Sequence, residues 1–276
     1  MTVTQVVRGD LVFDVTASGP TDGEPILLLH GFPQHASSWD ALVPLLTEQG
    51  YRTLAMNQRG YSAGANPHGR GAYRITELVA DAVAVIDELA GGKAHVVGHD
   101  WGSAVAWGIG MTHPAKVRTL TALSVPHTGA FLTSMLRSRQ ILKSWYMGMF
   151  QIPWLPERLL NATYVRSMVG SGQSLERARR DAAEFAGPES FTGPLNWYRA
   201  LPLSDPRTSR TPVNLPTLFI WGDGDDFVTR AAAERCARYV SGPFRFETLR
   251  GASHWLADEA PAEVAALLLA HLRALS

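Results

Sequence analysis

The feature that most constrains the fold of this chain is the pentapeptide Gly-His-Asp-Trp-Gly at residues 98–102. The residues before it, 94–97, are predicted to form a buried strand, and residues 101–111 have the pattern of a helix. Glycines on both sides of the central residue permit a sharp strand-to-helix turn, which exposes the central side chain above the end of the strand. The sequence therefore predicts that Asp100 is presented at a strand end.

The chemistry of Asp100 differs from that of the serine found in many turns of this kind. A serine that attacked a saturated carbon would form an ether, which water does not readily remove. A carboxylate that attacks the same carbon forms an ester, which water can cleave. Aspartate is ionised at neutral pH, because its ordinary pKa is about 3.9. Asp100 is therefore predicted to be a nucleophile toward an alkylating substrate, such as an epoxide or an alkyl halide.

Strand and helix patterns alternate along most of the chain. The predicted strands are residues 26–29, 51–56, 94–97, 117–125, 217–221 and 245–249. The predicted helices include 76–89, capped by Thr76, then 101–111, and 261–272, which begins at Pro261. Residues 11–15 and the turn at 19–23 suggest an antiparallel hairpin at the sheet edge. Such alternation predicts an α/β fold with a mostly parallel central sheet flanked by helices on both faces.

The alternation stops between residues 127 and 211, which are helical in pattern and rich in aromatic residues and methionine. Proline and glycine mark both edges of this stretch. We interpret it as a helical cap inserted into the α/β core. The predicted organisation is thus a core from 1–126, a cap from 127–211 and a second part of the core from 212–276.

Two candidate partners of Asp100 follow predicted strands later in the chain. Asp225 lies just after the strand at 217–221, and His254 just after the strand at 245–249. Catalytic groups in open α/β sheets gather at the carboxyl ends of strands. The order nucleophile, acid, histidine is one of the orders known for catalytic triads. We expect His254 to activate water and Asp225 to orient its ring, with Asp223 and Asp226 as competing candidates for the acid.

The sequence His-Gly-Phe-Pro at residues 30–33 follows the predicted strand at 26–29. We interpret the N–H groups of Phe32 and Trp101 as an oxyanion hole, because Trp101 begins a helix whose first amides have no intrahelical acceptor. The bond between Phe32 and Pro33 is then a candidate cis peptide.

Which leaving group the site can accept depends on the hydrogen-bond donors that the cap contributes. An epoxide oxygen leaves as an alkoxide and needs a proton or strong hydrogen bonds, whereas a halide needs weak N–H donors. Tyr146 and Tyr198 are candidates for the first task, although their pattern alone favours core residues.

Several motifs together resemble the soluble epoxide hydrolases of the α/β-hydrolase superfamily. They are His-Gly-Phe-Pro at 30–33, Gln-Arg-Gly-Tyr-Ser at 58–62, the turn at 98–102, Gly-Pro-Leu-Asn-Trp-Tyr-Arg at 193–199, Trp-Gly-Asp-Gly-Asp at 221–225 and Ser-His-Trp at 253–255. The resemblance implies that Asp100, Asp225 and His254 form the triad and that Tyr198 and Tyr146 open the ring. The residues expected around the substrate are His30, Pro33, Trp145, Phe150, Trp197 and Trp255.

Haloalkane dehalogenases resemble the same turn, so dehalogenation is an alternative. Many of them carry a halide-binding asparagine where this chain has Phe32, which favours the epoxide. Asn57 and Ser103 also depart from residues common among epoxide hydrolases. A further alternative is a biosynthetic ring-opening enzyme or a receptor, and the complete triad argues against a receptor.

The composition of the chain indicates which partners and cofactors it is not expected to bind. The 276 residues carry 25 basic and 25 acidic side chains, so net charge gives no reason to expect nucleic acid or an acidic membrane surface as a partner. No metal-ligand spacing or nucleotide motif is visible, which predicts no metal and no cofactor. One cysteine and no signal-like apolar segment predict a cytoplasmic protein. The expected partners are water and a small apolar or aromatic epoxide, and the chain is expected to be a monomer or homodimer.

Overall fold

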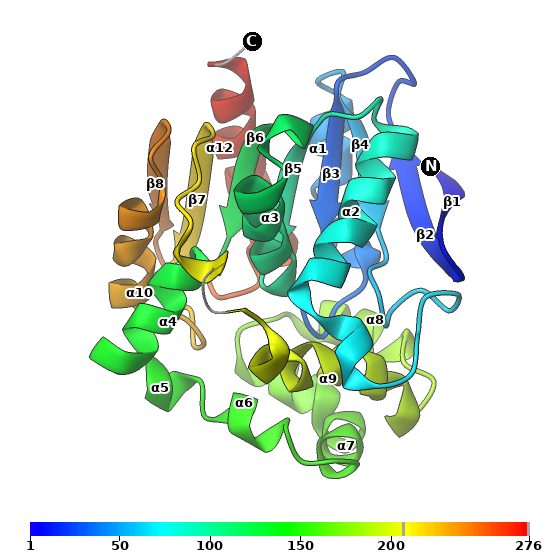
Figure 1. The fold of residues 1–276 in the computed structure, drawn as a ribbon, viewed down its shortest axis with the longest axis vertical. Helices are drawn as coiled ribbons and strands as arrows, with labels where there is room; N and C mark the ends of the chain where they lie inside the picture. Colours follow the sequence, from blue (N-terminus) through cyan, green and yellow to red (C-terminus); the bar gives the residue numbers. More distant parts are fainter. Residues whose placement is uncertain (206–207, 275–276) are drawn as a thin grey trace.

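Eight strands form one sheet in the part of the chain that the computed structural model describes, residues 1–205 and 208–274 (Figure 1). Their spatial order is β1-β2-β4-β3-β5-β6-β7-β8. Strands β3 to β8 are parallel, and β2 pairs antiparallel with β4. The strands are β1 (Thr2–Arg8), β2 (Leu11–Ser18), β3 (Pro25–Leu29), β4 (Arg52–Met56), β5 (Ala94–His99), β6 (Val117–Leu123), β7 (Thr217–Gly222) and β8 (Phe244–Leu249). The predicted α/β class and mostly parallel sheet are confirmed.

The hairpin at the sheet edge differs from the prediction. Its second strand, β2, contains the expected residues, but it pairs with β1 and not across the turn at 19–23. That turn leads to β3 in the middle of the sheet. Strand β1 escaped prediction because Val6 is its only buried residue, so little apolar alternation marks it.

Helices cover both faces of the sheet because its central strands are apolar on both sides. In β3, Leu27 and Leu29 join the core beneath α2, α3 and α10, whereas Ile26 and Leu28 join the core beneath α1 and α12. Successive side chains of a strand point to opposite faces, so a continuous apolar run suits a strand buried on both. These helices are α1 (Val43–Thr47), α2 (Ile75–Leu89), α3 (Trp101–Thr112), α10 (Arg230–Arg235) and α12 (Pro261–Arg273).

The prediction that Thr76 caps the N-terminus of α2 is wrong. The helix begins at Ile75, its N-cap residue is Arg74, and no side chain caps it. Thr76 lies inside the first turn, where it lines the cavity described below.

The segment between β6 and β7 is helical and lies over the carboxyl ends of the parallel strands (Figure 1). It contains α4 (Thr128–Arg137), α5 (Gln140–Lys143), α6 (Tyr146–Met149), α7 (Leu155–Gly170), α8 (Leu175–Ala183) and α9 (Thr192–Arg199). An apolar cluster joins it to the core: Phe150, Tyr164 and Tyr198 pack with Phe32 and Trp255. The division of the chain at residues 126 and 211 stays a prediction.

Charged groups also join the cap to the core. Arg180 of α8 forms an ion pair of 3.0 Å with Asp258, which lies in the short helix α11 (Leu256–Glu259). The amide of Gln34 donates to both Asp258 and Asp181. Because α11 begins two residues after His254, this network ties the cap to the segment that carries the predicted base.

Candidate active site

Asp100 occupies the turn between β5 and α3 with a left-handed backbone, φ 51° and ψ −117°. The flanking glycines make this turn possible. A Cβ on Gly98 would lie 2.2 Å from the carbonyl oxygen of Gly102, and one on Gly102 would lie 2.0 Å from that of Leu29. Only hydrogen fits in either place, and the side chain of Asp100 is thereby held above the sheet edge.

The structure brings Asp100, Asp225 and His254 together. His254 Nε2 lies 3.4 Å from Asp100 Oδ2, and His254 Nδ1 lies 2.7 Å from Asp225 Oδ2. The other oxygen of Asp225 accepts hydrogen bonds from the N–H groups of Phe227 and Val228. These contacts orient the carboxylate toward the imidazole.

The two competing acids do not occupy this place. Asp223 is exposed and accepts a hydrogen bond from the N–H of Gly251 at 2.5 Å. Asp226 is exposed as well, whereas Asp225 is buried. Asp225 is therefore the acid in contact with His254.

The electrostatics of the three groups favour an ion pair in the free protein. Burial alone would lower the pKa of His254, but Asp225 and Asp100 outweigh it and raise the pKa to about 10. Burial alone would raise the pKa of Asp100, but the hydrogen bond and charge of His254 lower it below its usual value. At neutral pH the imidazolium thus lies between two carboxylates.

The main-chain N–H of Phe32 donates a hydrogen bond of 2.8 Å to Asp100 Oδ1, and the Phe32–Pro33 peptide is cis. Trp101 is the first residue of α3, so its N–H has no acceptor within the helix. His30 supports this loop from behind. Its Nε2 accepts from the N–H of Gln58, whose side chain donates back to the carbonyl of His30. Burial lowers the pKa of His30 to about 3, so the ring is a neutral acceptor.

Tyr146 and Tyr198 reach the cavity of Asp100 from two cap helices, α6 and α9. Their ring centroids are 6.0 Å apart. The ring of Tyr198 also packs edge-on against Trp101 and Phe32, with both centroid distances at 5.1 Å. Burial raises the pKa of both phenols above the usual value, with Asp100 adding to the rise in each. Both hydroxyls are therefore protonated donors.

A cavity of about 590 Å³ contains Asp100, His254 and both tyrosines. One face of α3 forms a wall of this cavity from the first turn of the helix to the last. The residues of this face are Trp101, Ala104, Gly108 and Met111. This spacing is one helix face, and ten residues of helix rise about 15 Å, so the cavity is a channel along α3. Most of the lining is apolar, and Thr112 and His113 lie at the end far from Asp100.

None of the six residues expected around the substrate is among those that line the channel. His30, Pro33, Phe150, Trp197 and Trp255 are buried or carry buried contacts, but none lines the channel. Phe150 and Trp197 pack behind Tyr198 and Trp101, and Trp255 packs against His254. Trp145 is 67% exposed and lies outside the channel, because the short helix α6 turns Tyr146 inward and its neighbour outward.

Sequence reasoning missed much of the channel wall. Phe131, Met147, Leu201 and Phe227 line it, and they come from four separate segments. Their apolar character signals only burial. The stripe on α3 carried a usable signal, since Ala104, Gly108 and Met111 share the helix face of Trp101.

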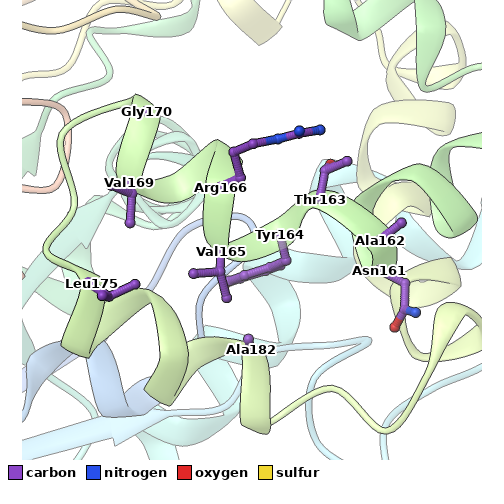
Figure 2. A pocket seen from close by; sticks show the side chains of 10 residues that line it. All are labelled: Asn161, Ala162, Thr163, Tyr164, Val165, Arg166, Val169, Gly170, Leu175 and Ala182. Carbon is purple, nitrogen blue, oxygen red and sulfur yellow. The ribbon is translucent and has the colours of Figure 1, made fainter.

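A second hollow lies on α7 and α8 and is open to solvent (Figure 2). Its lining includes Tyr164, Arg166 and Leu175 and shares no residue with the channel. Over residues 1–205 and 208–274, no group of three or more histidine, cysteine, aspartate or glutamate side chains is arranged to hold a metal ion. Within the same described ranges, no helix combines the length and apolar character needed to cross a membrane.

The chain is similar to known proteins over most of its length. Residues 24–261 match the family model described as the alpha/beta hydrolase fold. The chain is 35% identical to AB hydrolase superfamily protein YfhM of Bacillus subtilis, covering 95% of each sequence. It is 32% identical to Epoxide hydrolase A of Mycobacterium tuberculosis, covering 95% of this chain and 94% of the relative. The crystal structure of Epoxide Hydrolase A from Mycobacterium thermoresistibile superposes with a TM-score of 0.87 at 28% identity, covering 99% of this chain and 98% of that one.

Proposed function

The chain belongs to the α/β hydrolase fold family, among its epoxide hydrolase-like members, and on this premise we propose that it hydrolyses an epoxide to a vicinal diol through an ester on Asp100. The observation that carries the proposal is the convergence of Asp100 with two protonated tyrosines in one apolar cavity. A nucleophile on one side and two hydroxyl donors on the other suit a three-membered cyclic ether.

In the first step, Asp100 attacks one ring carbon and the bond from that carbon to the ring oxygen breaks. Tyr198 and Tyr146 hydrogen-bond to that oxygen, and a phenol proton neutralises the alkoxide as it forms. The products are a hydroxyalkyl ester of Asp100 and a tyrosinate. Preorganised donors aimed at a developing oxyanion are among the largest contributions to catalysis.

Ester formation changes the electrostatics of His254. One of the two carboxylates that raise the pKa of the imidazole becomes a neutral ester, so the pKa falls. The proton that His254 then loses restores the tyrosinate to a phenol. The neutral imidazole can act as a base only after alkylation.

In the second step, neutral His254 takes a proton from water, and the hydroxide attacks the carbonyl carbon of the ester. The N–H groups of Phe32 and Trp101 stabilise the oxyanion on Asp100, consistent with the 2.8 Å bond from Phe32 to that carboxylate. The ester bond breaks, the imidazolium gives its proton to the leaving alkoxide, and the diol departs. The carboxylic acid left on Asp100 then passes its proton to His254, which restores the ion pair of the free protein. Asp225 keeps the imidazole oriented throughout.

The substrate class that fits the channel is an apolar or aromatic epoxide. Tyr146 and Tyr198 favour an epoxide over a haloalkane, because a departing halide takes no proton. Two alternative functions are distinguished by experiment. One is haloalkane dehalogenation, and the other is biosynthetic ring opening, in which a substrate group replaces water.

The decisive experiment is one turnover in heavy-oxygen water, with excess enzyme over a styrene-type epoxide. We expect Asp100 to acquire the label and the first diol to carry an unlabelled protein oxygen. Label in the diol alone would mean direct attack by water and would exclude the covalent scheme. A parallel panel of chloro- and bromoalkanes, with Asp100→Asn as the inactive control, distinguishes the reactions: halide release without diol formation would favour dehalogenation.

A further inference from the structure

Exposed apolar side chains gather on the first part of the cap. Leu136 is 87% exposed, and Ile141, Leu142 and Trp145 are also more than half exposed. Together with Leu132 we call them the cap strip; they lie on α4, on α5 and just before α6. These helices follow one another along the outer edge of the cap (Figure 1). Contiguous exposed apolar surface on a soluble domain marks an interaction site.

Within the segment that carries the cap strip, residues 127–156, every charged side chain is basic. Residues 127–156 include Arg137, Arg139 and Lys143 but no aspartate or glutamate. Arg137 and Arg139 are exposed, and neither forms an ion pair within residues 1–205 and 208–274. Lys143 donates to the main-chain carbonyl of Asp225. The zero net charge of the whole chain, which predicted no anionic surface as a partner, therefore conceals a local excess of cations.

The exposed tryptophans of the chain lie in the first part of the cap, within residues 127–156. The chain has 8 tryptophans, and the two that are exposed, Trp145 and Trp154, both belong to this part of the cap. The guanidinium of Arg158 lies 5.4 Å from the ring centre of Trp154. Tryptophan and arginine side chains are amphipathic and suit the boundary between water and lipid.

The cap strip is continuous with the channel. Leu132 lines the channel and is itself 48% exposed. Leu136 follows one helical turn later on α4, so the two share a helix face. Apolar surface thus leads from the outer edge of the cap to the wall of the channel.

We propose that the cap strip docks on an anionic lipid surface. Arg137 and Arg139 contact the acidic headgroups, and the apolar side chains enter the boundary of the acyl region. A second copy of this chain fits less well, because a twofold interface through the strip would oppose two pairs of arginines with no acid from 127–156 between them. An apolar epoxide dissolved in lipid would then reach the channel directly, a consequence that rests on the proposed function.

The test is flotation of the purified full chain with vesicles of phosphatidylcholine, alone or with phosphatidylglycerol. No epoxide is present, so the outcome does not depend on the proposed reaction. We expect binding to the anionic vesicles and its loss at high salt. R137S/R139S should weaken binding about 30-fold, from two surface cations, and L136S/L142S/W145S about tenfold or more.

A matched control replaces exposed valines of β1, V3S/V7S, and should leave binding unchanged. Unchanged circular dichroism and an unchanged thermal unfolding temperature establish that each variant is folded. The proposal is overturned if the wild type does not float, if it binds neutral and anionic vesicles equally, or if the strip variants bind like the control. It is also overturned if sedimentation shows a dimer that L136S/L142S/W145S converts to a monomer without any change in vesicle binding.

Discussion

Ser124 Oγ donates a hydrogen bond of 2.7 Å to the main-chain carbonyl of His254. His99 Nε2 donates to the same oxygen at 2.9 Å. Burial lowers the pKa of His99 to about 4, so this ring is neutral and its Nε2 carries the hydrogen. Two strand ends, those of β5 and β6, thereby hold the loop that carries the proposed base. Ser124 does so with a left-handed backbone, φ 66°, a conformation that a serine adopts only when its surroundings stabilise it.

Replacing Ser124 should therefore slow hydrolysis of the ester more than its formation, because the imidazole must be placed against water in the second step. We expect Ser124→Ala to lose about 1–2 kcal/mol of unfolding free energy, as a buried acceptor loses one of its donors. Urea unfolding and single-turnover kinetics measure the two effects. Ser124→Gly is the matched variant, since it removes the same hydroxyl but relaxes the backbone. Equal slowing of both steps would show that Ser124 acts on overall stability and not on the placement of His254.

The second prediction concerns Tyr198. Tyr198→Phe removes a donor to the ring oxygen and leaves the packing against Trp101 and Phe32 in place. We expect the rate of ester formation to fall about 100-fold, the usual effect of losing one oxyanion donor, and the rate of ester hydrolysis to change little. Rapid-quench trapping of the Asp100 ester separates the two rates. Tyr146→Phe should act in the same direction. If Tyr198→Phe slows only ester hydrolysis, the phenol has no part in ring opening.

The third prediction is the pH dependence of stability. The pKa of His254 is about 10 in the folded protein, against about 6.5 for histidine in an unfolded chain. A raised native pKa means that the folded state binds the proton more tightly. The stabilisation is therefore complete below about pH 6.5 and is lost as the pH rises toward about 10.

Urea unfolding across that pH range checks this expectation. Asp225→Asn removes the charge that most strongly raises the pKa of His254, so the fall in unfolding free energy with rising pH should be shallower in this variant. Comparing the variant with the wild type cancels the contributions of the other titrating groups. Parallel curves for the two proteins would contradict the ion pair.

The juxtaposition of Asp100, Asp225 and His254 was predictable because all three follow strands whose carboxyl ends meet at one edge of the sheet. The choice among Asp223, Asp225 and Asp226 was not, because adjacent residues of a tight turn point in different directions. The structure distinguishes them through the N–H groups of Phe227 and Val228, which hold only Asp225 toward His254. Such contacts depend on the local backbone path, which spacing does not encode.

For the same reason, the sequence could not predict which side chains of the cap face the channel and which face solvent. Trp145 and Tyr146 are neighbours in an aromatic stretch, and one is exposed while the other lines the channel. A helix of four residues is too short for periodicity to show which face is buried. The contact of Ser124 with His254 joins residues 130 positions apart, so no local pattern could indicate it.

The last prediction concerns the channel along α3. Ala104 lies one turn after Trp101, on the stripe that forms the wall. Ala104→Leu should narrow the channel beyond Asp100, so that a long epoxide loses the burial of about three methylene groups. At about 0.8 kcal/mol for each, kcat/KM for a long-chain terminal epoxide should fall about 50-fold, while a short epoxide that fits beside Asp100 should keep its rate within about threefold. Competition between the two substrates, with thermal unfolding as the check on folding, measures the ratio. If both rates fall together, Ala104→Leu disturbs the turn that carries Asp100. If neither rate changes, the substrate chain does not lie along α3.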